Sequence, residues 1–144
     1  MTRRESREAV FCLLYENILR KDADFKEIYA LAVDIRGIEE NDYIKSTYTS
    51  FFEHCGEVDE LIEKAAVGWR VDRMSAVTLA ILRLCAYELA YTPEVPLNVA
   101  INEAVELAKK YDADTAAAFI NGILIKISCE MRPGEAENSK KSNE

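Results

Sequence analysis

This sequence contains little of what interrupts helices or builds a chemical centre. It has only five glycines and three prolines in 144 residues, while 49% of its residues are hydrophobic, so long helices can form with few interruptions. Its one histidine, His54, has no cysteine, histidine or aspartate at metal-ligand spacing. Glycine loops that cradle phosphate and nucleophile-elbow motifs are absent. We therefore expect a helical protein that needs no metal or cofactor, has no catalytic residues and is not an enzyme.

Two further absences concern the compartment. The four cysteines are far apart and form no CxxC pair, so we expect buried free thiols in a reducing environment. The charged N-terminus is followed by no apolar signal segment, and charged residues cut every hydrophobic run below the roughly 18 residues that a bilayer requires. These features predict a cytoplasmic protein without membrane contact.

Positive charge is also scarce. Acidic residues outnumber basic ones by 26 to 18, which gives a formal net charge of −8. A protein with this charge does not attract nucleic acid through its overall field. Any binding of nucleic acid must come from a local basic patch or from a basic partner.

What the sequence does have is helical periodicity, without any strand signal. The organising stretch comprises a near-continuous apolar helix at 75–91, a two-faced helix at 97–111 and an apolar-faced helix at 115–127. A helix that is apolar nearly all round must be buried on most sides, so the first of these is predicted to be the central pillar. Gly122, inside the last helix, costs about 1 kcal/mol relative to alanine, which predicts close approach of another helix or of a ligand.

Capping residues mark the helices that precede this stretch. Thr2 opens a capping box ahead of a helix that runs to about residue 20, and Asp24 and Asn41 can cap the next two helices. Periodicity fades near the C-terminus, where the composition becomes polar. We expect one domain over residues 1–130, followed by a disordered polar tail over 131–144.

The first predicted helix combines cations and aromatic rings along one edge. Arg3, Arg7, Phe11 and Tyr15 follow one another at i+4 spacing, and Arg4 lies beside them. Cations that hold phosphate and rings that stack bases are typical of surfaces for single-stranded nucleic acid. The residues alone favour a plainer interpretation, in which the arginines are solvated and both rings belong to the core.

Two runs in the second half of the chain resemble a known family. VAINEAVELAK at 99–109, followed by FINGIL at 119–124, is similar to the transcription antitermination factor NusB family. ILRL at 81–84 and YEL at 87–89 agree with the same family, and the resemblance covers about residues 2–128. It implies an all-α fold of two three-helix bundles packed across each other, with about seven helices.

The resemblance also implies a binding role. NusB-like proteins bind the single-stranded boxA element of nascent ribosomal RNA leaders together with a small-subunit ribosomal protein, NusE. They hold this RNA near RNA polymerase in the antitermination complex. The family's RNA surface corresponds here to Arg3, Arg4, Arg7 and Tyr15 in the first helix, and to Phe119 at the start of the last. A homodimer remains an open alternative to a monomer.

Two departures from the family pattern keep other functions open. Ala118 replaces the basic residue that usually precedes the phenylalanine, and Thr78-Leu79 replaces an acidic-basic pair before the ILR run. Together with the acidic charge, the first departure favours a protein-only helical adaptor that has lost RNA binding. An accessory domain of an RNA-modifying enzyme is disfavoured, because the sequence has no nucleotide-binding glycine motif.

Overall fold

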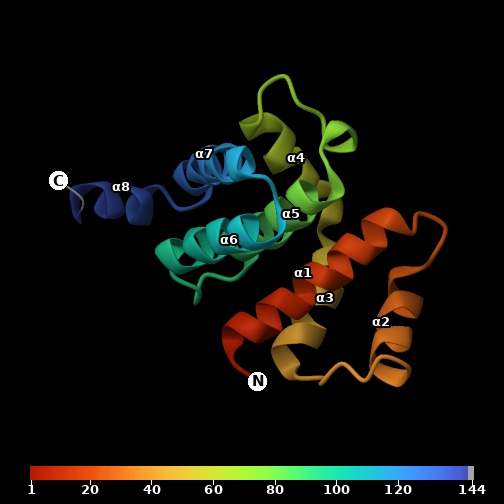
Figure 1. Cartoon of the computed structure of the whole chain (residues 1–144). Helices are drawn as coiled ribbons and strands as arrows, with labels where there is room; N and C mark the ends of the chain where they lie inside the picture. Colours follow the sequence, from red (N-terminus) through yellow and green to blue (C-terminus); the bar gives the residue numbers. More distant parts are fainter. Residues whose placement is uncertain (143–144) are drawn as a thin grey trace.

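The protein is described by a computed structural model in which the backbone of residues 1–142 is placed. These residues form helices and no strands, as the sequence predicts (Figure 1). The eight α-helices of this part of the chain are α1 (Arg3–Leu19), α2 (Phe25–Asp34), α3 (Asp42–Glu53), α4 (Cys55–Ala65), α5 (Ala76–Tyr91), α6 (Leu97–Tyr111), α7 (Asp114–Met131) and α8 (Pro133–Ser142). A short 3₁₀ turn, η1 (Val71–Arg73), lies between α4 and α5.

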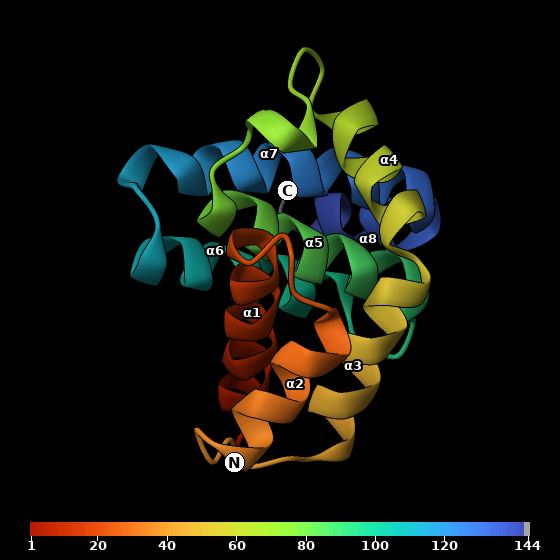
Figure 2. The same cartoon turned by 90° about the vertical axis from the view of Figure 1, so that its right-hand side faces the viewer.

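The helices are arranged as two bundles that share a central element. Helices α1, α2 and α3 form the first bundle, and α5, α6 and α7 form the second (Figures 1 and 2). Helix α4 leads from one to the other and packs against α5 and α7. Since α5 also packs against α1, it joins the two bundles and is the predicted central pillar.

Helix α5 holds this place because its surface is apolar nearly all round. Ala80, Ile81, Leu82 and Ala86 have no exposed surface, and each large aliphatic side chain buried in this way contributes about 1.5–3 kcal/mol. Ser75 is the N-cap of this helix, and its hydroxyl oxygen accepts a hydrogen bond from the Thr78 N–H at 3.2 Å. No helix within the described residues is long and apolar enough to cross a membrane.

The predicted helix starts are confirmed where the capping signal is local. Thr2 and Glu5 form the complete capping box, with reciprocal hydrogen bonds of 3.1 and 3.0 Å. Asp24 accepts from the Lys26 N–H, and Asn41 accepts from the N–H of the third residue of α3. These side chains satisfy backbone donors that a helix start leaves without an intrahelical acceptor.

The prediction that all four cysteines are buried is wrong. The thiols are free, but only Cys85 is buried, where its Sγ donates to the Ala100 carbonyl at 3.2 Å. Cys12 and Cys129 are exposed, and Cys55 is half-buried. Cys12 and Cys129 lie on the solvent-facing sides of α1 and α7, while other residues of these helices form the buried apolar side.

The C-terminal segment also differs from its prediction as a disordered tail. Residues 133–142 form helix α8, while residues 143–144 lie outside the described part of the chain. Contacts with distant residues hold the segment: Ala136 is only 6% exposed, and Glu135 accepts from the Leu97 N–H at 3.2 Å. Polar composition indicates disorder only where no such contacts exist.

Arg132, between α7 and α8, is the strongest of these attachments. Its guanidinium donates hydrogen bonds of 2.6–3.0 Å to four backbone carbonyls at the end of α5 and in the following loop, those of Glu88, Leu89, Thr92 and Val95. Carbonyls at a helix C-terminus lack intrahelical donors. The arginine therefore caps α5 and anchors the start of α8.

Gly122 does not have the close contact that the sequence predicts. It is exposed in the middle of α7, and an added Cβ would meet no atom within 4 Å. The glycine therefore costs helix stability without allowing another element to approach.

We predict that Gly122→Ala stabilises the protein by about 0.5–1 kcal/mol, because alanine loses less backbone entropy in a helix. Chemical denaturation would measure this as a higher midpoint. Gly37→Ala is a control in the opposite direction, since Gly37 has φ +66° and alanine is strained there. An unchanged or lower midpoint for Gly122→Ala would contradict the prediction.

Candidate nucleic-acid interface

The five residues predicted to bind RNA do not form one continuous surface. Arg3 and Arg4 are exposed at the start of α1, and Tyr15 is half-buried near the other end of that helix. Arg7 lies inside the protein. Phe119 is half-buried on α7, in a separate patch.

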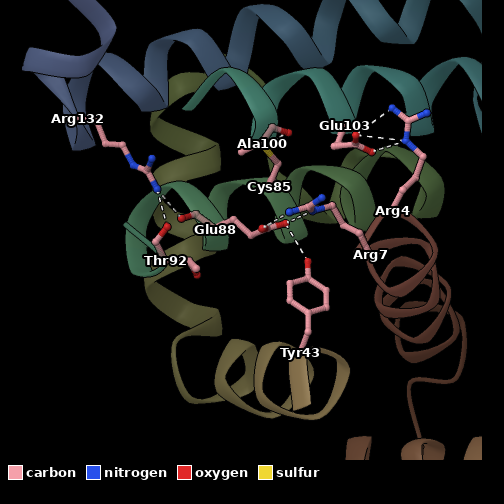
Figure 3. A network of polar contacts seen from close by, with 9 residues as sticks. All are labelled: Arg4, Arg7, Tyr43, Cys85, Glu88, Thr92, Ala100, Glu103 and Arg132. Atoms are coloured by element: carbon pink, nitrogen blue, oxygen red, sulfur yellow. Dashed lines mark hydrogen bonds and ion pairs between the residues drawn. The ribbon is translucent and has the colours of Figure 1, made fainter. Parts of the chain in front are cut away.

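Arg7 belongs to a buried ion pair that joins three helices (Figure 3). Its Nε and Nη2 donate to the two carboxylate oxygens of Glu88 on α5 at 2.8 and 3.0 Å. Tyr43 on α3 donates its hydroxyl to the same carboxylate at 3.2 Å. Arg7 is only 5% exposed and Glu88 only 1% exposed, so the Arg7 guanidinium presents almost no open surface to a ligand.

The pKa directions of Arg7 and Tyr43 agree with a charged guanidinium and a protonated phenol. Burial acts to lower the pKa of Arg7, but its hydrogen bonds to Glu88 and the charge of that carboxylate outweigh burial and raise it. Burial, and then the Glu88 charge, raise the pKa of Tyr43, so its hydroxyl keeps the proton that it donates. Each charge thus has its partners, as burial requires.

Arg3, which is exposed, contacts the ring of the same tyrosine, Tyr43. Its guanidinium carbon lies 4.2 Å above the centre of the Tyr43 ring, while that of Arg7 lies 5.6 Å from the same centre. A guanidinium at this distance is attracted by the ring quadrupole. Arg3 forms no ion pair with any carboxylate of the described residues, so its charge faces solvent uncompensated.

In contrast, the cations along the seam between α1 and α6 are paired with carboxylates. This seam contains a cleft of about 370 Å³ between the two helices. Three ion pairs cross or border it: Arg4–Glu103 at 3.0 Å, Lys110–Glu8 at 2.8 Å and Lys109–Glu106 at 3.5 Å. Every cation that would attract phosphate there already has a carboxylate.

Sequence reasoning did not identify the two lysines of this seam as site residues. Lys109 and Lys110 end helix α6, where cations also stabilise the helix dipole, so their local pattern has a sufficient explanation. Lys110 reaches Glu8 across 102 residues of sequence. The hydrogen bonds from Lys110 and Tyr111, in that order, lower the pKa of Glu8.

The aromatic residues of α1 divide between core and surface. Phe11 is 3% exposed and packs 5.1 Å from Tyr111 between ring centroids, so the plainer interpretation is right for this ring. Tyr15 is half-buried and stacks on Phe11 at 6.3 Å. Only Tyr15 keeps ring surface that an incoming base can reach.

Phe119 packs its ring edge-on against Trp69 at a centroid distance of 5.9 Å. Both rings line a hollow of about 350 Å³ beside η1 and the first turns of α5 and α7. Ala118 is exposed, as its helical phase predicts, but it lines a different groove, between α6 and α7. A basic residue at position 118, as in the family pattern, would therefore face this groove and not the hollow beside Trp69.

The model of the NusB family matches residues 4–128. The chain is 41% identical over 137 residues to the transcription antitermination protein NusB of Ruminiclostridium cellulolyticum, covering 94% of each chain. It is 43% identical to that of Acetivibrio thermocellus, covering 88% of each. The chain belongs to the NusB family.

Solved NusB structures have the same fold. The NusB of T. maritima is 32% identical and superimposes with a TM-score of 0.81, covering 96% of this chain and 98% of that one. A structure of the antitermination factors NusB and NusE in complex with double-stranded RNA matches with a TM-score of 0.79 at 29% identity, covering 89% and 96%. The predicted all-helical NusB fold is confirmed.

Within the part that the structure describes, no three histidine, cysteine, aspartate or glutamate side chains are grouped to hold a metal ion. The groups that the candidate interface offers to a ligand are guanidinium and ammonium groups, and the partly exposed rings of Tyr15, Trp69 and Phe119.

We predict that Glu88→Gln destabilises the protein by about 3–5 kcal/mol, because it leaves Arg7 buried without its counter-charge. Glu103→Gln is the matched control: it breaks an ion pair whose arginine side chain is 63% exposed and should cost much less stability than Glu88→Gln. Urea unfolding of both variants measures the difference. Equal losses would show that the buried pair has no special role.

Proposed function

We propose that this chain is an antitermination factor that binds single-stranded boxA RNA of ribosomal RNA leaders together with the ribosomal protein NusE. The observation that carries the proposal is the exposed start of α1, where Arg3 and Arg4 lie on the surface of a NusB fold. The likeness to a NusB–NusE–RNA complex supports it. The role is one of binding in the cytoplasm, near RNA polymerase, without catalysis.

Within this proposal the predicted residues have different roles. Arg3 and Arg4 contact phosphate, while Tyr15 and Phe119 offer ring surface to bases. Arg7 is a positioning residue, since it fixes α1 against α5 through Glu88. The RNA surface of α1 therefore depends on Arg7 without including it.

The partner contributes what the chain lacks. A net charge of −8 repels RNA at long range, and Arg4, Lys109 and Lys110 are already paired with carboxylates. A basic ribosomal protein offsets this repulsion and extends the contact surface. We expect the complex with NusE to be the form that binds RNA tightly.

Mobility-shift titrations of a boxA-containing RNA, with and without NusE at the same salt concentration, test the proposal. The complex should bind much more tightly than the chain alone. Equal affinities would contradict the role given to the partner. Binding of NusE with no RNA binding in either titration would establish the alternative, a protein-only adaptor.

We further predict that Glu103→Gln strengthens RNA binding, because it releases Arg4 to bind a phosphate. The log–log salt dependence should steepen by about 0.7 for each additional phosphate of the single strand that the protein neutralises. Glu130→Gln is the matched control, since it makes the same charge change at the exposed Lys64–Glu130 pair, between α4 and α7.

The comparison separates a local effect from an effect of net charge. An increase for Glu103→Gln alone would identify the seam as part of the RNA surface. Equal increases in both variants would mean that only total charge matters, and an unchanged affinity for Glu103→Gln would show that Arg4 does not contact RNA.

A further inference from the structure

The hollow beside Phe119 contains further residues, Trp69 and Arg73, to which no RNA contact is assigned above. It lies where the segment between α4 and α5 passes over the first half of α7 (Figure 2). Trp69 and Phe119 form its aromatic walls, and Arg73 of η1 supplies a cation. Thr115 and Ser75 add hydroxyl groups from the starts of α7 and α5.

Trp69 is exposed in a fixed position. It is 53% exposed, although tryptophan is usually well buried. Its backbone N–H donates to the Ala66 carbonyl at 2.8 Å, in a turn that Gly68 makes with φ +88°. The edge-on contact with Phe119 restricts the indole further. A large ring is therefore held in place with much of its surface open to solvent.

The charges around this ring favour an anionic ligand. Arg73 is exposed and forms no ion pair among the described residues, unlike the cations of the α1–α6 seam. The N-terminal turns of α5 and α7, where the helix dipole places partial positive charge, both border the hollow. The carboxylate of Asp112 accepts hydrogen bonds from the Thr78 hydroxyl at 2.6 Å and from the Ala113 N–H at 2.8 Å, and it forms no ion pair with Arg73.

We propose that Trp69, Phe119 and Arg73 form a subsite for one unstacked nucleotide of single-stranded RNA. The base stacks on the open surface of the indole, and Arg73 pairs with the adjoining phosphate. An accessible ring beside an unpaired cation is the combination that single-strand sites use. This inference rests on the proposed RNA-binding function and extends it to Trp69 and Arg73.

The protein carries its own reporter for this subsite, because Trp69 is the only tryptophan in the chain. Its emission should be quenched when boxA RNA is added to the complex with NusE. The quenching should saturate at the same RNA concentration as the mobility shift. The complex made with Trp69→Phe provides the background emission of the partner.

Variants give a second, independent measurement. Trp69→Ala should weaken RNA binding about five- to 140-fold, the range expected for the loss of one stacked base, whereas Trp69→Phe should keep most of the affinity. Arg73→Gln should flatten the log–log salt dependence by about 0.7. Val67→Ala is the matched control on the same loop: Val67 is 79% exposed and does not line the hollow.

The outcomes distinguish this inference from the function on which it rests. RNA that shifts in mobility with unchanged emission, and with equal affinity for Trp69→Ala, would overturn the subsite and leave RNA binding intact. Loss of NusE binding by Trp69→Ala, with unchanged affinity for RNA alone, would assign the hollow to the protein partner instead. Absence of RNA binding in every titration would overturn both proposals.

Discussion

The Glu88 carboxylate is the point on which both bundles depend. It accepts hydrogen bonds from Arg7 of α1 and from Tyr43 of α3 (Figure 3). The backbone carbonyl of the same residue accepts a hydrogen bond from Arg132, which follows α7. A buried carboxylate costs several kcal/mol in lost hydration unless its partners are complete. The apolar packing around α5 brings the helices together, and this one polar group fixes how they must be placed.

The placement of these helices produces two kinds of surface cation. Arg4 and the two lysines that end α6 lie opposite carboxylates in the seam, so an RNA phosphate must compete with them. Arg3 and Arg73 have no such competitor within the described residues. If RNA binds here as proposed, its affinity is limited by ion pairs that are individually weak, and it should depend on salt and on a partner's charge.

Sequence reasoning succeeded where the cause of a structure is local. The capping box at Thr2 and the nearly continuous apolar surface of α5 depend on neighbouring residues, and both are as predicted. It failed where the deciding contact is distant. Nothing near Arg7 in the sequence shows that its partner lies 81 residues away, and nothing in the polar composition of α8 shows that Arg132 anchors it.

The same separation has a consequence for how the protein is made. Arg7 leaves the ribosome long before Glu88, so the first bundle cannot bury its arginine while α5 is still being synthesised. Whole domains often fold in order of synthesis, but within this one fold the first bundle cannot be completed until α5 has been made. A nascent chain that stops before Glu88 therefore carries α1 without the contact that orients it, and the proposed RNA surface of α1 forms only once α5 has been made.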